Sequence, residues 1–163
     1  IFRINLPIRE EMSQEDEKVF KNHLAIAPST RATNSSVLVI DNDPVIQDLM
    51  MWALFREGYA FFAAYNGIDG INRAKELLPG IIILDIDMPG MDGWEVLTKL
   101  KEDPKLSSIP IIILSMVDDK MQEYSWGLAE YLPESAQEIF QKGLYTRDEL
   151  IGKVTVLIKK RFA

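Results

Sequence analysis

Residues 81–84 constrain the fold of this chain more than any other segment. They are three isoleucines followed by a leucine, and no polar residue interrupts them. A short, unbroken apolar run rich in β-branched residues predicts a strand that is buried on both faces. The run ends in Asp85, and Pro89-Gly90 and Asp92-Gly93 follow it with the composition of a loop. An acid at the carboxyl end of a buried parallel strand lies where open α/β sheets bind ligands and carry out chemistry.

A second apolar run, residues 37–40, also ends in side-chain oxygens. Asp41-Asn42-Asp43-Pro44 follows it directly. Proline suits the first turn of a helix and aspartate suits the N-cap before it, so Asp43 has a structural role available. Asp41 and Asn42 are therefore the candidates for a functional pocket.

A third apolar run, residues 111–114, ends in Ser115. Elsewhere in the chain, apolar runs alternate with segments of helical periodicity, which predicts a doubly wound α/β fold with a parallel sheet. We expect helices over residues 44–56, 67–78, 94–102 and 147–161, another after Asp119, and a strand near residues 59–64. A flavodoxin-like five-stranded order, 2-1-3-4-5, would bring Asp41, Asn42 and Asp85 to one switch point.

Composition excludes several classes of protein. The chain has 163 residues, a net charge of −7, no cysteine and one histidine. The negative charge argues against direct binding to nucleic-acid phosphates, and thiolate or histidine metal sites lack their ligands. No apolar run approaches the roughly 18 residues of a membrane span. We therefore expect a cytoplasmic location, with no membrane contact by this fragment.

The segment around Asp85, together with the three polar strand ends, resembles the receiver domain of two-component response regulators. The resemblance implies that Asp85 accepts a phosphoryl group from phosphohistidine and that Ser115 contacts that group. It also implies a Mg²⁺ site formed by Asp41, Asn42, Asp85 and the backbone carbonyl of Asp87. The implied partner is a histidine kinase or a histidine phosphotransfer domain, and the domain itself is a regulatory phosphoacceptor rather than an enzyme. Oxygen ligands with several retained waters are what Mg²⁺ prefers.

The chain departs from the receiver pattern in three places, of which Asn42 and Met116 are the first two. Asn42 stands where receivers have an acid, so one full charge is lost and Mg²⁺ should bind more weakly. Met116 follows Ser115, where receivers favour a small residue.

The basic residue of receivers can be placed in two registers. A gapless alignment, which we favour, puts Glu134 in the place of the receiver lysine. A shifted register takes residues 138–142 as the fifth strand and recovers Lys142 at the cost of an insertion.

The amino-terminal part differs from the rest in composition. Residues 1–8 alternate apolar and polar positions and resemble the last strand of a histidine-kinase ATP-binding domain. Residues 9–35 have the acidic and polar composition of a linker. The receiver would then span residues 36–163, in a fragment of a hybrid histidine kinase.

Two other functions are compatible with these sequence features. A pseudo-receiver would keep the fold for protein contacts with little or no phosphorylation, and Asn42, Met116 and Glu134 favour it. A haloacid-dehalogenase-type phosphatase would use Asp85 and Asp87 as its Asp-x-Asp motif, but Met88 follows where that family wants threonine or valine.

Overall fold

The computed structural model describes residues 35–115, 139–141 and 145–163. Five strands and four helices lie in these ranges: β1 Ser36–Ile40, α2 Pro44–Arg56, β2 Ala60–Ala64, α3 Gly67–Leu77, β3 Ile81–Asp85, α4 Gly93–Glu102, β4 Ile111–Ser115, β5 Ile139–Gln141 and α6 Arg147–Phe162. Every strand pairing is parallel, in the order β2-β1-β3-β4-β5. The α/β fold, the parallel sheet and the order of the first four strands are as predicted.

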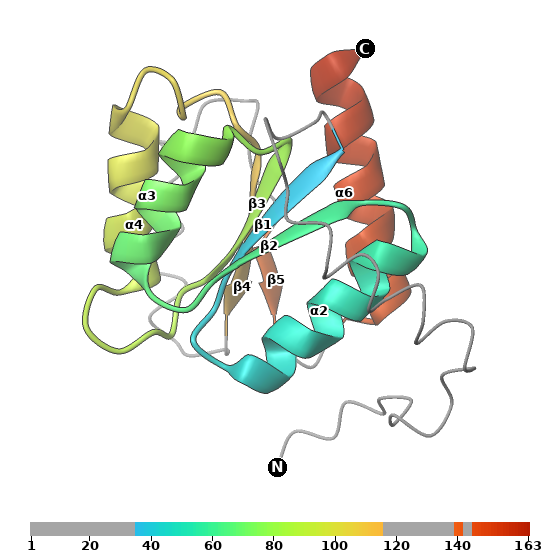
Figure 1. The fold of residues 1–163 in the computed structure, drawn as a ribbon, viewed down its shortest axis with the longest axis horizontal. Coiled ribbons are helices and arrows are strands. Elements are labelled where there is room, and N and C mark those ends of the chain that lie inside the picture. Colours follow the sequence, from blue (N-terminus) through green and yellow to red (C-terminus); the bar gives the residue numbers. More distant parts are fainter. Residues whose placement is uncertain (1–34, 116–138, 142–144) are drawn as a thin grey trace. The chain divides into compact units, whose positions relative to one another are not determined.

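Alternate residues of the central strands face opposite sides of the sheet. Leu38 and Ile40 of β1 belong to one apolar cluster, while Val37 and Val39 belong to another. The same alternation divides β3, so a strand that reads as a continuous apolar run fills two cores. Figure 1 shows α3 and α4 on one side of the sheet and α2 and α6 on the other.

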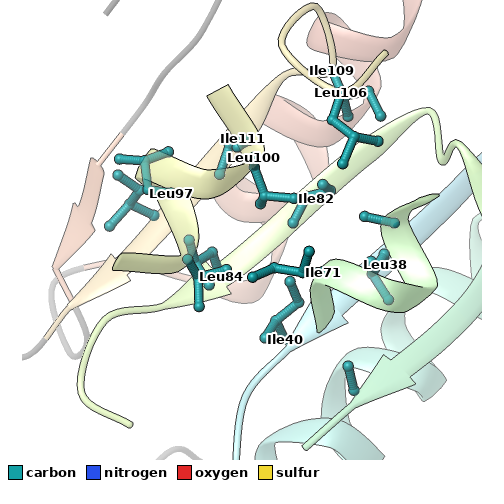
Figure 2. Packing of buried hydrophobic residues seen from close by; sticks show 14 of the residues in the cluster. Leu38, Ile40, Ile71, Ile82, Leu84, Leu97, Leu100, Leu106, Ile109 and Ile111 are labelled. Carbon is teal, nitrogen blue, oxygen red and sulfur yellow. The ribbon is translucent and has the colours of Figure 1, made fainter. Parts of the chain in front are cut away.

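The core under α3 and α4 is closely packed. In Figure 2, Ile82 and Leu84 of β3 meet Ile71 of α3 and Leu97 and Leu100 of α4. Fully burying a side chain of this size contributes about 1.5–3 kcal/mol. The two apolar layers hold β1 and β3 firmly, and so fix the positions of the residues that follow them.

The ends of α2 follow local signals in the sequence. Asp43 is its N-cap, as predicted, because its side chain accepts a hydrogen bond from the Val45 N–H at 2.8 Å. Gly58, with φ +82°, ends the helix by adopting the left-handed conformation that glycine tolerates.

The buried face of α2 differs in one respect from a simple apolar stripe. Val45 is 56% exposed although the apolar periodicity places it on the inner face. It lies in the first turn of the helix, directly after Pro44. Gln47 is buried instead, on the face shared with Met50 and Leu54.

The fifth strand corrects one expectation. β5 pairs with β4 through Ile113↔Ile139 and Leu114↔Phe140, within the segment of the shifted register. The gapless register that we favoured is therefore wrong about the position of this strand. Matching letters without gaps favoured it, but strand formation depends on pairing and on residues of high β-propensity, which Ile139 and Phe140 supply.

Several predicted features fall outside the described residues. They are the segments 1–8 and 9–34, the helix after Asp119, Met116, Glu134 and Lys142. Lys142 follows the last residue of β5 in the sequence.

Candidate functional site at the carboxyl ends of β1 and β3

Asp41, directly after β1, is 1% exposed. Its backbone N–H donates to the carbonyl oxygen of Ala64 at 3.0 Å, which extends the pairing of β1 with β2 by one residue. Its Oδ1 accepts a hydrogen bond from the Asp43 N–H at 2.8 Å. The turn that begins α2 therefore holds the Asp41 carboxylate at the end of the strand.

Asp85, the last residue of β3, is 2% exposed. Its Oδ1 accepts a hydrogen bond from the Asp87 N–H at 3.1 Å. The next backbone N–H, that of Ile86, donates to the carbonyl oxygen of Leu114 at 3.1 Å. The position of this carboxylate is thus tied both to its own loop and to the neighbouring strand β4.

The loop after Asp85 packs tightly against the strand end. A Cβ on Gly93 would collide with the carbonyl oxygen of Asp85 and with the Cα of Ile86. Only glycine lets α4 begin so close to the backbone of β3. Asp92 caps that helix, because its Oδ1 accepts from the Glu95 N–H at 2.9 Å. The Asp-Gly pair of the sequence motif therefore serves the approach of α4 to the site.

The strand register brings the two acids together. Ile40 pairs with Leu84, so Asp41 and Asp85 follow at adjacent positions on neighbouring strands, which lie about 4.8 Å apart in a sheet. On the other side, Asp85 pairs with Leu114, and Ser115 is the next residue of β4. Three of the residues predicted for the site thus gather at the carboxyl ends of three adjacent strands.

Asn42 and Asp87 lie in the loops that follow β1 and β3, and both are exposed. Within the described ranges, no group of three or more His, Cys, Asp or Glu side chains is arranged to hold a metal ion. Mg²⁺ does not need such a group, because it retains several waters and uses one or two carboxylates. Two buried carboxylates at adjacent strand ends, flanked by an amide and a backbone carbonyl, are a donor set that fits this ion.

Tyr145 is a neighbour of the acids that sequence reasoning missed. It directly precedes Thr146, the N-cap of α6, and packs on the same apolar cluster as Leu150. Burial, and then the negative charges of Asp41 and Asp85, raise the pKa of Tyr145 from 10.0 to about 12. The capping box formed by Thr146 and Glu149 was a readable signal for the helix start, but not for the proximity of this phenol to the acids.

Gln47 is the second residue that was missed. It is 1% exposed, and its side-chain amide donates to the backbone carbonyls at the ends of β1 and β2. A signal was present, since residues 47, 50 and 54 share one face of a helix.

Comparisons of the sequence with known proteins identify its family and several relatives. The family model "Response regulator receiver domain" matches residues 37–153. The DNA-binding dual master transcriptional regulator RpaA of Synechocystis sp. is 31% identical over 127 residues, which cover 76% of this chain and 49% of that protein. The response regulator PleD of Caulobacter vibrioides is 32% identical over 109 residues, covering 65% of this chain and 24% of that protein.

Solved structures agree with the fold. The receiver domain of the Francisella response regulator 1452 superposes with a TM-score of 0.66 at 26% identity, covering 77% of this chain and 98% of that chain. The response regulator TrrA of Thermotoga maritima, solved in complex with Mg²⁺-BeF, superposes with a TM-score of 0.61 at 28% identity, covering 76% of this chain and 98% of that chain.

The curated relatives extend beyond the matched region, since the chain spans about half of RpaA and about a quarter of PleD. Receiver domains are regulatory phosphoacceptors of two-component systems, so neither the phosphatase nor the pseudo-receiver is the favoured function. Within the described ranges, no helix is long and apolar enough to cross a membrane. Because this family model matches more than half of the chain, the chain belongs to the response regulator receiver domain family.

Proposed function

We propose that Asp85 is the phosphoacceptor of this receiver domain. The observation that carries the proposal is the pair of buried carboxylates, Asp41 and Asp85, at adjacent ends of β1 and β3. Burial removes both acids from bulk water, and each is oriented by a backbone N–H of its own loop.

The transfer moves one phosphoryl group between two nucleophiles. A carboxylate oxygen of Asp85 attacks phosphorus and forms the new P–O bond, while the P–N bond to the partner's imidazole breaks and that ring takes up a proton. Bound Mg²⁺ supplies charge neutralisation for the phosphoryl oxygens. Asp41, the amide oxygen of Asn42, a carboxylate oxygen of Asp85 and the backbone carbonyl of Asp87 would hold this ion. Ser115 follows Leu114 in β4 and would contact the phosphoryl group.

The shifted register makes Lys142 the candidate for the basic residue of the site. It follows Gln141, whose partner in β4 is Ser115. Because β4 and β5 are parallel neighbours in the five-stranded sheet, Gln141 lies at the same edge of the sheet as Ser115.

The phosphodonor would be a histidine kinase or a histidine phosphotransfer domain in the cytoplasm. The domain arrangement that we propose is a receiver at residues 36–163, preceded by a linker at residues 9–35 and by the last strand of a kinase domain at residues 1–8. The match of the family model to residues 37–153 supports the boundaries of the receiver.

The test is phosphorylation of the whole chain by a small-molecule phosphodonor with Mg²⁺, read by intact mass. We expect the wild type to gain one phosphoryl group and Asp85→Asn to gain none. Asp43→Asn is the matched control, because Asp43 lies in the neighbouring loop and asparagine also caps helices well. Equal labelling of wild type and Asp85→Asn would refute the assignment, and a folded but unlabelled wild type would point to the pseudo-receiver.

A further inference from the structure

Gln47 is the fourth residue of α2, and its side-chain amide contacts the backbone at the carboxyl ends of β1 and β2. Its Nε2 lies 3.1 Å from the carbonyl oxygen of Val39 and 2.9 Å from those of Asp41 and Ala64. These carbonyls belong to the ends of two strands and to the first residue after β1. One buried amide therefore joins β1, β2 and the loop that carries Asp41.

The backbone of Asp41 is held on both sides as a result. Its N–H donates to the carbonyl oxygen of Ala64, and its own carbonyl accepts from Gln47. With both flanking peptide units fixed, the direction of the Cα–Cβ bond is fixed as well. The hydrogen bond from the Asp43 N–H to Oδ1 then helps to orient the Asp41 carboxylate.

This arrangement is not the most stable choice for a buried helix face. A glutamine amide has two hydrogens, whereas three carbonyl oxygens lie within reach of Nε2. Its Oε1 is buried and has no hydrogen-bond partner among the residues that the structure describes. A buried polar atom without a partner destabilises a fold, so the benefit of this side chain has to lie in what the amide holds.

We infer that Gln47 is a positioning residue of the receiver site, which orients the Asp41 carboxylate toward a divalent cation by fixing the backbone at the end of β1. The inference rests on the proposed function, because it gives Asp41 a role in Mg²⁺ binding. A neutral donor suits this position, since a cationic side chain would itself neutralise the carboxylates that attract the ion.

The test compares two buried polar side chains of the same sheet. Gln47→Met removes the donor and keeps an unbranched chain of similar size. Ser36→Ala is the matched control, because Ser36 lies at the opposite end of β1 and is also fully buried. The Oγ of Ser36 accepts a hydrogen bond from the Gly80 N–H. Each variant of the whole chain is measured for urea unfolding, for Mg²⁺ affinity by calorimetry and for hydrogen exchange of the Asp41 and Asp43 amides.

We expect Gln47→Met to weaken Mg²⁺ binding about tenfold, the scale seen when a partner that orients a metal ligand is lost. Exchange of the two amides should accelerate by a similar factor after correction for the change in global stability. Ser36→Ala should lower stability without changing either quantity.

If both variants bind Mg²⁺ with wild-type affinity, Gln47 contributes only to the stability of the fold and the inference is wrong. Failure of the proposed function looks different, because the wild type itself would then bind no Mg²⁺ and accept no phosphoryl group. In that case, amide exchange still decides the positioning: faster exchange at Asp41 in Gln47→Met alone supports it, and unchanged exchange overturns it.

Discussion

At the amino-terminal end of the sheet, two cations donate hydrogen bonds to backbone carbonyls, whereas at the carboxyl end two carboxylates accept hydrogen bonds from backbone N–H groups. Arg161 donates to the carbonyls of Pro79 and Gly80, just before β3, at 2.8 and 3.0 Å. Lys101 donates to the carbonyls of Ser107 and Ile109, before β4, at 3.0 and 3.2 Å.

The difference separates stability from function. At the amino end, the cations complete the hydrogen bonding of loop carbonyls, and nothing in their arrangement requires a ligand. At the carboxyl end, the carboxylates of Asp41 and Asp85 are buried close together. Their like charges destabilise the metal-free protein but favour a bound cation. Four expected outcomes test this contrast.

The largest effect is expected at the amino end. Arg161→Met should lower the free energy of unfolding by about 1.5–3 kcal/mol, because it removes a charged donor shared by two carbonyls. Urea unfolding measures the change. Lys160→Met, which removes an exposed cation from the same turn of α6, should stay within about 0.5 kcal/mol of the wild type. Equal losses in the two variants would show that Arg161 acts only through its charge on the helix end.

A change of the opposite sign is expected at the carboxyl end. Asp85→Asn should raise the free energy of unfolding by about 1–2 kcal/mol in metal-free buffer, because it removes one of two buried like charges. Substitutions at functional sites often stabilise a protein in this way at the expense of its function. Mg²⁺ should stabilise the wild type and leave the variant unchanged, as expected when an ion binds only the native state. A variant less stable than the wild type without metal would contradict the proposed separation of stability and function.

Local chemistry explains which features of the fold and of the site could be predicted from the sequence. Continuous apolar runs predicted β1, β3 and β4, and the cap at Asp43 marked the start of α2, because each of these signals acts within a few residues. The juxtaposition of Asp41 and Asp85 followed from the strand order alone, since parallel strands end at the same edge.

Features that join distant segments were harder to predict. Gln47 approaches the carbonyl of Ala64, 17 positions away, only because α2 packs across the sheet. Tyr145 interacts with Asp41 and Asp85 because the fold brings these distant parts of the sequence together, which no spacing in the sequence encodes. The position of β5 depended on pairing with β4, and that is why letter matching placed it wrongly.

A smaller effect at the amino end should appear at alkaline pH. Burial, and then the charge of Arg161, lower the pKa of Lys101 from 10.5 to about 8. Between pH 8 and 10.5 the unfolded chain therefore binds more protons than the native protein, and the free energy of unfolding should rise with pH from this group. Lys101→Met should remove that rise when unfolding is measured across this range. A rise that persists in the variant would assign it to another group.

The smallest effect should come from Tyr145 and should have the opposite sign. Its native pKa of about 12 exceeds the value of 10.0 in an unfolded chain, so the native state binds more protons above pH 10 and stability should fall as pH rises toward 12. Spectroscopic titration of tyrosinate in metal-free buffer isolates the residue as the difference between wild type and Tyr145→Phe. Asp85→Asn should lower this pKa, because it removes one of the two negative charges that raise it. An unchanged pKa in Asp85→Asn would mean that burial and the charge of Asp41 set this pKa without a contribution from Asp85.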